Sequence, residues 1–214
     1  TGIRRFVIGG GIAMNIKMNK AISELDEVEE LFVCGSSGDE SLSIGGCYLL
    51  NSNPKGNQPI RNLYLGYDIR DEIDQFDANS YANKYDIQYG VTFDQVASLL
   101  EKGEIVAVVR GRAEFGARAL GNRSILANPS RRETVQQINE AIKNRDFWMP
   151  FALSILEEQL DEYIFNPKKL QSPFMAISLD VRPEMNSEIE AGTHPYDKTV
   201  RPQAVSSKEA PEYH

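Results

Sequence analysis

Residues Gly111–Leu126 read GRAEFGARALGNRSIL, and this stretch is the one around which the chain is expected to fold. It places Arg112, Arg118 and Arg123 among three glycines, together with Glu114 and Asn122. A helix is not expected, because each interior glycine costs about 1 kcal/mol relative to alanine. A strand would leave the charges unpaired. The composition predicts an irregular loop whose backbone approaches a ligand and whose guanidinium groups face anionic oxygens.

The flanking residues place this loop between two strands. Ile105–Val109 (IVAVV) predicts a buried strand, and Ser124–Ala127 predicts a short one. From Arg110 to Arg145, eight basic side chains stand against three acidic ones, a net charge of +5 in a chain of net charge −8. Such a basic island in an acidic protein favours one small anionic ligand over a polyanion, although a solvated basic face is the alternative.

A second group of cations follows a predicted helix. Ser130-x-x-Glu133 is a capping pattern, and Val135, Ile138 and Ile142 give the helix one apolar face. Lys143-Asn144-Arg145 ends it, directly before the aromatic and proline-containing run Asp146–Phe151. These cations are either partners of the helix dipole or the charged rim of a shaped wall.

The first residues form two strand and helix units. Ile3–Ile8 predicts a strand, Gly9-Gly10-Gly11 a turn able to cradle a phosphate, and the residues through Ile22 a helix. Val28–Cys34 predicts a second strand, and Ser41–Leu50 a buried helix. Asp39, between them, is either a metal ligand near phosphates or part of a helix start with the capping box Ser37-x-x-Glu40.

The remaining expectations concern connections and core elements. They are a linker at Asn51–Asn62, short helical pieces in Tyr64–Asp86, a helix from a Thr92-x-x-Gln95 capping box through Leu100 to Lys102-Gly103, core strands at Ala152–Leu156 and Phe174–Leu179, an acidic helix at Glu157–Tyr163, and a tail after Val205. His194 is the only internal histidine, and either catalyses or is incidental.

Composition bounds the class of protein. The 214 residues can form one large domain or two small ones. Cys34 and Cys47 lie in apolar runs without a CxxC pair, which predicts buried free thiols in the cytoplasm. No apolar run approaches the ~18 residues of a membrane-spanning helix, and no signal peptide is visible. Neither a membrane nor nucleic acid is an expected partner.

The order of motifs resembles that of the O-carbamoyltransferases of the NodU/CmcH family. GGGIAMN, GDESLSIGG, GRAEFGARALGNRSIL, KNRDFWMPFA, SPFM and THPYDKTVRPQAV follow one another from Phe6 to Val205. The resemblance implies an α/β (α+β) fold. Residues 1–55 are similar to the C-terminal end of an actin-like carbamoyl-transfer domain. A linker at 56–62, a YrdC-like twisted-sheet domain at 63–205 and a tail at 206–214 would follow.

The resemblance also implies the chemistry. The YrdC-like domain would form carbamoyladenylate from carbamoyl phosphate and ATP with Mg. The actin-like domain would transfer the carbamoyl group, with Fe or another divalent metal, to a hydroxyl of a small acceptor such as a nodulation factor, an antibiotic or another secondary metabolite. Because most of the actin-like domain is absent, this chain alone is not expected to complete the transfer. The alternative is a non-catalytic nucleotide- or RNA-binding module. A homodimer is compatible with either reading.

Site residues carry over position by position. The implied catalytic residues are Arg118, Lys143 and Arg145; the implied carbamoyladenylate and phosphate ligands are Arg123, Asn122, Ser172, His194 and Arg201; Gly9, Gly10 and Gly11 would contact nucleotide, and Asp39 a metal. Arg112 is expected to be structural, paired with Glu114. The chain departs from the family pattern at Ala117, Met149 and Glu40, which removes one anion contact and alters the surroundings of Asp39.

Overall fold

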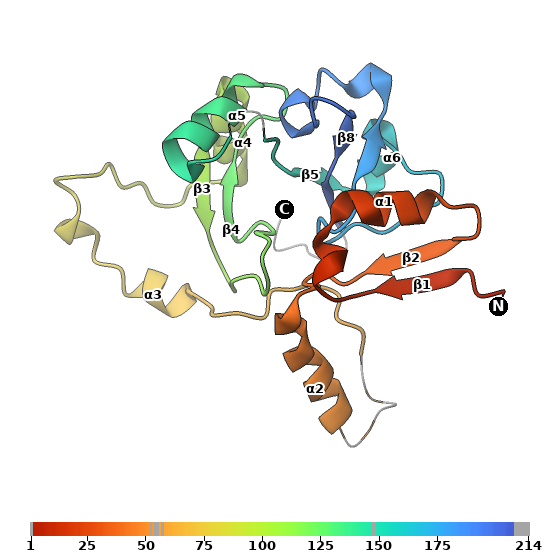
Figure 1. The fold of residues 1–214 in the computed structure, drawn as a ribbon. Coiled ribbons are helices and arrows are strands. Elements are labelled where there is room, and N and C mark those ends of the chain that lie inside the picture. Colours follow the sequence, from red (N-terminus) through yellow and green to blue (C-terminus); the bar gives the residue numbers. More distant parts are fainter. Residues whose placement is uncertain (1, 52, 54–55, 57, 147–148, 208–214) are drawn as a thin grey trace.

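Helices and short strands alternate along the chain, and the strands form small separate sheets (Figure 1). The structure is a computed structural model that describes residues 2–51, 53, 56, 58–146 and 149–207. The predicted mixed α/β class is confirmed. Phe147 and Trp148 of the predicted wall, four residues of the predicted linker, and residues 208–214 of the predicted tail lie outside the described residues. Within those residues, no helix has the length and apolarity that crossing a bilayer requires.

The first unit is a strand, a glycine turn, a helix and a second strand, as predicted, and the two strands are parallel. Strand β1 (Arg5–Ile8) leads through the 3₁₀ turn η1 (Gly11–Met14) to helix α1 (Ile16–Glu24), and β2 (Glu30–Val33) returns beside β1. Asn15 caps α1, because its side-chain oxygen accepts a hydrogen bond from the Met18 amide at 3.1 Å. Helix α1 therefore serves as the crossover that two parallel strands require.

The second predicted helix is present, but it is not buried. The 3₁₀ turn η2 (Asp39–Ser41) leads into α2 (Leu42–Leu50), which projects away from the rest of the fold (Figure 1). Leu42, Leu49 and Leu50 are 72%, 88% and 87% exposed. The apolar composition predicted burial, but no described element covers this helix. The burial predicted for the two free thiols is also wrong: Cys47, on α2, is exposed, and Cys34, directly after β2, is partly exposed.

The segment between the second unit and the central hairpin extends away from the fold (Figure 1). It holds α3 (Arg70–Asp74) and the 3₁₀ turn η4 (Ala78–Ser80), which confirms the short helical pieces. Helix α4 (Phe93–Lys102) follows, with both halves of the predicted capping box formed between Thr92 and Gln95. Gly103 ends α4 at φ 94°, in the left-handed region that glycine enters without strain.

Replacing Thr92 by alanine is expected to lower the free energy of unfolding by about 1 kcal/mol, because the Gln95 amide loses its side-chain acceptor. Urea denaturation measures the change. Ser98→Ala is the matched control, since Ser98 is exposed within the same helix and alanine has the higher helix propensity. A Thr92→Ala variant as stable as the Ser98→Ala variant would show that the box contributes nothing.

Strands β3 (Val106–Val109) and β4 (Arg123–Leu126) form an antiparallel pair with Val106 opposite Leu126. Both predicted strands are therefore present, but the burial predicted for β3 is wrong. Val109 is 59% exposed, because β3 pairs with β4 alone. The pair is a hairpin whose connection, residues 110–122, contains most of the arginine- and glycine-rich stretch.

The helix after the hairpin changes its winding. Helix α5 (Glu133–Ile138) continues into a π-helical turn, η5 (Asn139–Lys143), and Asn144 leaves it at φ 48°. Val135 and Ile138 are buried as predicted, whereas Ile142 is 52% exposed. The predicted cap is wrong, because the Ser130 hydroxyl donates to the Asn128 side chain at 2.8 Å and not toward the helix.

The C-terminal part contains two further sheets. Its elements are β5 (Leu153–Leu156), η6 (Glu157–Gln159), α6 (Leu160–Tyr163), β6 (Ile164–Phe165), β7 (Leu179–Val181), η7 (Pro183–Met185), η8 (Glu190–Gly192), β8 (Thr199–Val200) and β9 (Pro202–Val205). Strand β9 pairs parallel with β5, and β7 lies between β6 and β8 in antiparallel order. The strand predicted at Ala152–Leu156 and the acidic helix after it are confirmed.

The strand predicted at Phe174–Leu179 is wrong except for its last residue. Phe174 and Ile177 are buried, but Met175 has φ 55°, which an extended strand excludes. The Ala176 carbonyl accepts a hydrogen bond from the Asn19 side chain at 2.7 Å instead of from a neighbouring strand. The apolar run in this segment therefore reports burial and not a strand.

One apolar core joins the two ends of the chain. Leu31 and Val33 of β2 belong to the same buried cluster as Ile155, Ile164 and Val200. Lys168 adds a polar clamp, because its ammonium donates to the carbonyls of Ser23, Leu25 and Val28 at 2.6, 2.7 and 2.6 Å. The predicted first and second domains are therefore packed together, and their boundaries remain predictions.

Candidate functional site

The connection between β3 and β4 is held from inside by one carboxylate. Glu114 Oε1 accepts hydrogen bonds from the backbone amides of Leu120, Asn122 and Arg123 at 2.7, 2.7 and 3.1 Å. Partial burial would raise the pKa of Glu114, but the bonds from these amides outweigh it and lower the pKa below its ordinary value. Glu114 therefore acts as an ionised centre around which the loop folds, and it does not pair with Arg112 as predicted.

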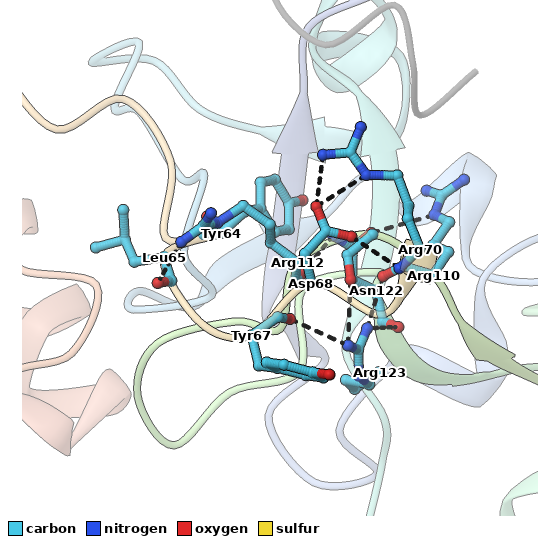
Figure 2. A network of polar contacts seen from close by, with 10 residues as sticks. Tyr64, Leu65, Tyr67, Asp68, Arg70, Arg110, Arg112, Asn122 and Arg123 are labelled. Carbon is cyan, nitrogen blue, oxygen red and sulfur yellow. Dashed lines mark hydrogen bonds and ion pairs between the residues drawn. The ribbon is translucent and has the colours of Figure 1, made fainter. Parts of the chain in front are cut away.

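Arg112 and Arg123 hold the loop from outside, as Figure 2 shows. Arg112 donates to the carbonyls of Tyr64 and Leu65 at 3.1 and 2.9 Å. Arg123 donates to four carbonyls, those of Arg110, Gly111, Asn122 and Tyr67, at 2.6, 3.2, 2.9 and 3.4 Å. Four of the five N–H groups of Arg123 are thus directed at the protein's own backbone. The structural role expected of Arg112 fits these contacts, and the geometry gives Arg123 a structural role as well.

Asn122 is also committed to the loop. It is fully buried. Its side-chain Nδ2 donates to the Arg112 carbonyl at 2.8 Å, and its side-chain oxygen accepts from Arg110 Nε at 3.1 Å. These bonds occupy the polar atoms that a ligand would need. The ligand roles predicted for Asn122 and Arg123 stay predictions, and the observed contacts favour loop support.

The tip of the same loop, residues 116–119, is not held by such hydrogen bonds. Arg118 is half-buried, and burial lowers the pKa of its guanidinium. Neither its side chain nor the backbone amides of Gly116, Ala117 and Ala119 have a hydrogen-bond partner among the described residues. Gly116 packs against the first unit, since a Cβ there would lie 2.4 Å from Ser36 Oγ. The loop thus presents one cation and several free N–H donors.

Arg145 comes from the end of the π-helical turn. Its Nε donates to Asn139 Oδ1 at 3.0 Å, and its guanidinium carbon lies 4.7 Å from the centre of the Phe151 ring. Nη2 is buried and has no partner among the described atoms. A buried guanidinium N–H without an acceptor is costly, so this atom is set up for an anion.

Arg201 lies between β8 and β9 and is the most perturbed of the cations. Burial lowers its pKa to about 10, and the neighbouring charges of Arg118 and Arg145 add to the effect. Its Nε is buried without a partner in the described part of the chain. The charges of Arg118 and Arg145 therefore both reach Arg201, although the three residues, which we call the arginine cluster, come from three separate stretches. None of the three forms an ion pair with a described residue.

Ser172 and Gln203 hold the strand that follows Arg201. The buried Ser172 hydroxyl donates to the Pro202 carbonyl at 2.8 Å, and Gln203 Nε2 donates to the Leu120 carbonyl at 2.9 Å. The second bond links β9 to the arginine- and glycine-rich loop. Ser172 is therefore placed as a support beside Arg201, and its predicted ligand role stays a prediction.

His194 and Lys143 are not seen to join the arginine cluster. His194 Nδ1 lies 3.2 Å from Asp197 Oδ1. Burial would raise the pKa of Asp197, but hydrogen bonds from Lys17 and Thr199 and the charge of His194 lower it to about 2. The bond from Lys17 ties this loop to α1. Lys143 is exposed at the end of η5, with no contact to another predicted site residue within the described part of the chain.

The nucleotide and metal residues of the first unit are exposed. Gly10 has φ 85°, and a Cβ on Gly10 or Gly11 would meet nothing within 4 Å, so this turn can be approached from outside. Asp39 is exposed, and the capping box is not formed, because Ser37 donates to the Cys34 carbonyl and Glu40 accepts from Ser36. The described residues contain no group of three or more side chains able to hold a metal ion. Asp39 and its described neighbours therefore do not form a metal site by themselves.

A cavity of about 1150 Å³ borders the arginine- and glycine-rich loop at Leu120. Its lining comes from β2, α2, residues 58–64, residues 171–174 and the end of β9, and it includes Ser36, Tyr48, Arg61, Ser172 and Gln203. None of the three clustered arginines lines it. The charge, the buried donors and the pKa shifts converge on the arginine cluster, which is the better candidate for chemistry.

Glu114 and Asn139 are the supporting residues that the sequence did not single out for these roles. The sequence marks each of them by a residue type that is unusual for its surroundings. Glu114 is a lone acid inside an arginine-rich loop, and Asn139 is an asparagine on an apolar helix face. Each is expected to be costly unless it is hydrogen-bonded. The residue types of Glu114 and Asn139 therefore indicate a supporting role, but they do not identify the hydrogen-bond partners.

The fold and this site define a class of protein, namely a mixed α/β protein with a group of partly buried arginines suited to an anion. Comparison with known proteins then gives the family. Residues 97–214 match the family model described as "Carbamoyltransferase C-terminus". The chain belongs to the carbamoyltransferase family.

Relatives match over nearly the whole chain. An uncharacterized protein of Methanocaldococcus jannaschii is 36% identical over 210 residues, covering 95% of this chain and 39% of that protein. Nodulation protein NolO of Bradyrhizobium diazoefficiens is 34% identical over 222 residues, covering 100% and 40%. Nodulation protein U of Azorhizobium caulinodans is 32% identical over 209 residues, covering 97% and 35%. The chain thus spans well under half the length of these relatives.

Proposed function

We propose that the arginine cluster binds carbamoyl phosphate and the phosphates of ATP and supports formation of carbamoyladenylate. The proposal is carried by two observations: Arg145 Nη2 and Arg201 Nε are buried without a described partner, and the charges of Arg118 and Arg145 reach Arg201 without any described acidic partner. Such an arrangement is unfavourable unless an anion joins it. Membership of the carbamoyltransferase family supports the carbamoyl group as the one that is activated.

The reaction brings several negative charges into one place. Carbamoyl phosphate, ATP and water give carbamoyladenylate, phosphate and pyrophosphate. Guanidinium forks can neutralise the phosphoryl oxygens pairwise as pyrophosphate leaves. The uncharged carbamoyl group needs hydrogen-bond donors instead, and the free amides of Gly116, Ala117 and Ala119 are suited to that task.

The rest of the pathway belongs to a longer protein. The exposed turn at Gly9, Gly10 and Gly11 would contact a nucleotide in a complete actin-like domain, and Asp39 would supply one ligand to a divalent metal there. Because the described residues do not form a metal site, no step is assigned to a metal here. The acceptor is a small hydroxylated molecule, as in nodulation-factor or antibiotic carbamoylation, and we place its contacts outside this chain.

Exchange of labelled pyrophosphate into ATP tests the proposal. The 214-residue chain is expected to catalyse exchange only when carbamoyl phosphate is present. Arg118→Lys is expected to lower the rate about 10-fold, because lysine keeps the charge but loses the two-pronged geometry, roughly one hydrogen bond of about 1.4 kcal/mol.

The control is Arg132→Lys, since Arg132 is exposed and its ion pair among the described residues is with Glu190 at 3.3 Å. It should exchange at the wild-type rate. Nucleotide binding without any exchange would favour the non-catalytic binding module. Equal rates in the wild type and in Arg118→Lys would remove Arg118 from the site.

A further inference from the structure

Asn139 is a fully buried polar residue that makes two hydrogen bonds with Arg145 of the arginine cluster. Its side-chain oxygen accepts from Arg145 Nε at 3.0 Å, and its backbone carbonyl accepts from the Arg145 amide at 3.1 Å. Its side-chain amide donates to the Met149 carbonyl at 3.0 Å. Asn139 therefore holds both the backbone amide and the side-chain Nε of Arg145, and it also holds the following chain at Met149.

The π-helical turn allows Asn139 to form both hydrogen bonds with Arg145. Asn139 begins the turn η5, and Asn144 at φ 48° reverses the chain so that Arg145 returns over the residue six positions earlier. In an uninterrupted α-helix, residues six apart point to different faces and do not meet in this way. Single π turns of this kind are frequent at functional sites.

The groups that hold Arg145 are all uncharged. They are an asparagine amide, a backbone carbonyl and the face of Phe151, and Nη2 remains buried and unpartnered. A carboxylate in the place of the Asn139 amide would hold Nε equally well, but it would cancel the charge that an anion needs. An amide rather than a carboxylate at position 139 therefore favours binding of an anion by Arg145, in addition to any effect on folding.

We propose that Asn139 is a positioning residue that orients Arg145 with a neutral acceptor and thereby keeps its charge available to the phosphorylated ligand. The inference rests on the proposed function, since it presumes that the arginine cluster binds an anion. Asn139 itself does not contact the ligand in this proposal. Asn139 affects the affinity for the ligand only by orienting Arg145.

Binding of inorganic pyrophosphate by the full chain, measured by titration calorimetry, tests this. Asn139→Asp is expected to weaken binding about 10-fold, and Arg145→Gln about 30-fold. Gln137→Glu makes the same amide-to-acid change on an exposed position of the same helix and should change binding less than 2-fold. Asn139→Ala, which adds no charge, should weaken binding about 5-fold through lost orientation.

The decisive readout is the coupling between the two positions. In an Arg145→Gln background, Asn139→Asp should change pyrophosphate affinity less than 2-fold. The Arg145 Nε–H signal in NMR spectra should exchange slowly in the wild type and be lost in Asn139→Ala while the protein remains folded.

The outcomes separate the two proposals. Wild-type affinity in Arg145→Gln would remove Arg145 from the anion site and overturn the proposed function of that residue. Weak binding in Arg145→Gln together with wild-type affinity in Asn139→Asp would overturn the role of Asn139 alone. An equal loss from Asn139→Asp in both backgrounds would show a general structural effect, and that result also contradicts the inference.

Discussion

Replacing Arg201 by methionine is expected to make the protein more stable and less active at the same time. The substitution removes a buried cation whose pKa is lowered to about 10 by burial and by Arg118 and Arg145. A depressed pKa means that the folded state disfavours the charge, and the penalty is present in full below about pH 10. Methionine fills a similar volume without charge. We expect the free energy of unfolding to rise by about 1–3 kcal/mol at pH 7.5.

Activity should change in the opposite direction. Removing one charged contact to a transferring phosphoryl group costs about 2.7–4 kcal/mol in the barrier, which corresponds to a loss of about 10²–10³ in the rate of pyrophosphate exchange. Urea denaturation and the exchange assay, applied to the same preparation, measure both effects. Arg132→Met is the control, because that side chain is exposed and lies outside the arginine cluster. A variant that loses both stability and activity would show that Arg201 is a structural residue.

Replacing Glu114 by alanine is expected to have the largest effect on folding. Three backbone amides in the loop lose their shared acceptor, those of Leu120, Asn122 and Arg123. Each unsatisfied partly buried donor costs at least about 1 kcal/mol, so a loss of about 3–5 kcal/mol is expected at pH 7. Hydrogen exchange at these amides should accelerate, and urea denaturation should give the loss in stability.

The pH dependence of this effect has a definite sign. The pKa of Glu114 is lower in the folded protein, so its ionised form stabilises the fold above the ordinary glutamate pKa. The stabilisation is lost as the pH falls through the lowered folded-state value. The difference between the wild type and Glu114→Ala should therefore be largest near neutral pH and narrow in acid. Glu140→Ala, on the exposed face of η5, should show neither effect; an unchanged gap at low pH would contradict the role of the charge.

Local patterns predicted the elements well. The capping box at Thr92, the strand on each side of the arginine-rich loop and the glycine turn before α1 are all present. These features depend on neighbours within a few residues, so the sequence contains what determines them. Ser130-x-x-Glu133 has the same pattern without forming a cap, because the Asn128 side chain competes for the serine hydroxyl.

Burial was harder to predict, because it depends on distant residues. Helix α2 is apolar enough to be buried, yet the described chain supplies nothing to cover it. Phe174–Ser178 is buried as an irregular segment, because the Asn19 side chain replaces a strand partner. Composition can indicate that a segment avoids water, but it does not say which element lies against it.

The site shows the same limit. Composition and the family resemblance together selected Arg118, Arg145 and Arg201, which the fold brings together. They also selected Arg123, whose guanidinium meets four carbonyls of its own chain. An arginine that binds a ligand and one that braces a loop are chemically identical. Only the acceptors that surround each guanidinium distinguish them.

The core that joins the two ends of the chain has a consequence for how the protein acquires its structure. Val33 can be buried against Ile155 and Val200 only after more than a hundred intervening residues have been ordered or looped out. Closing loops of this length lowers the rate of folding, since the entropy is lost before the contacts form. During synthesis Leu31 and Val33 of β2 therefore stay without these contacts until the strands that carry Ile155 and Val200 leave the ribosome. Apolar surface that is exposed in this interval makes the unfinished chain prone to aggregate.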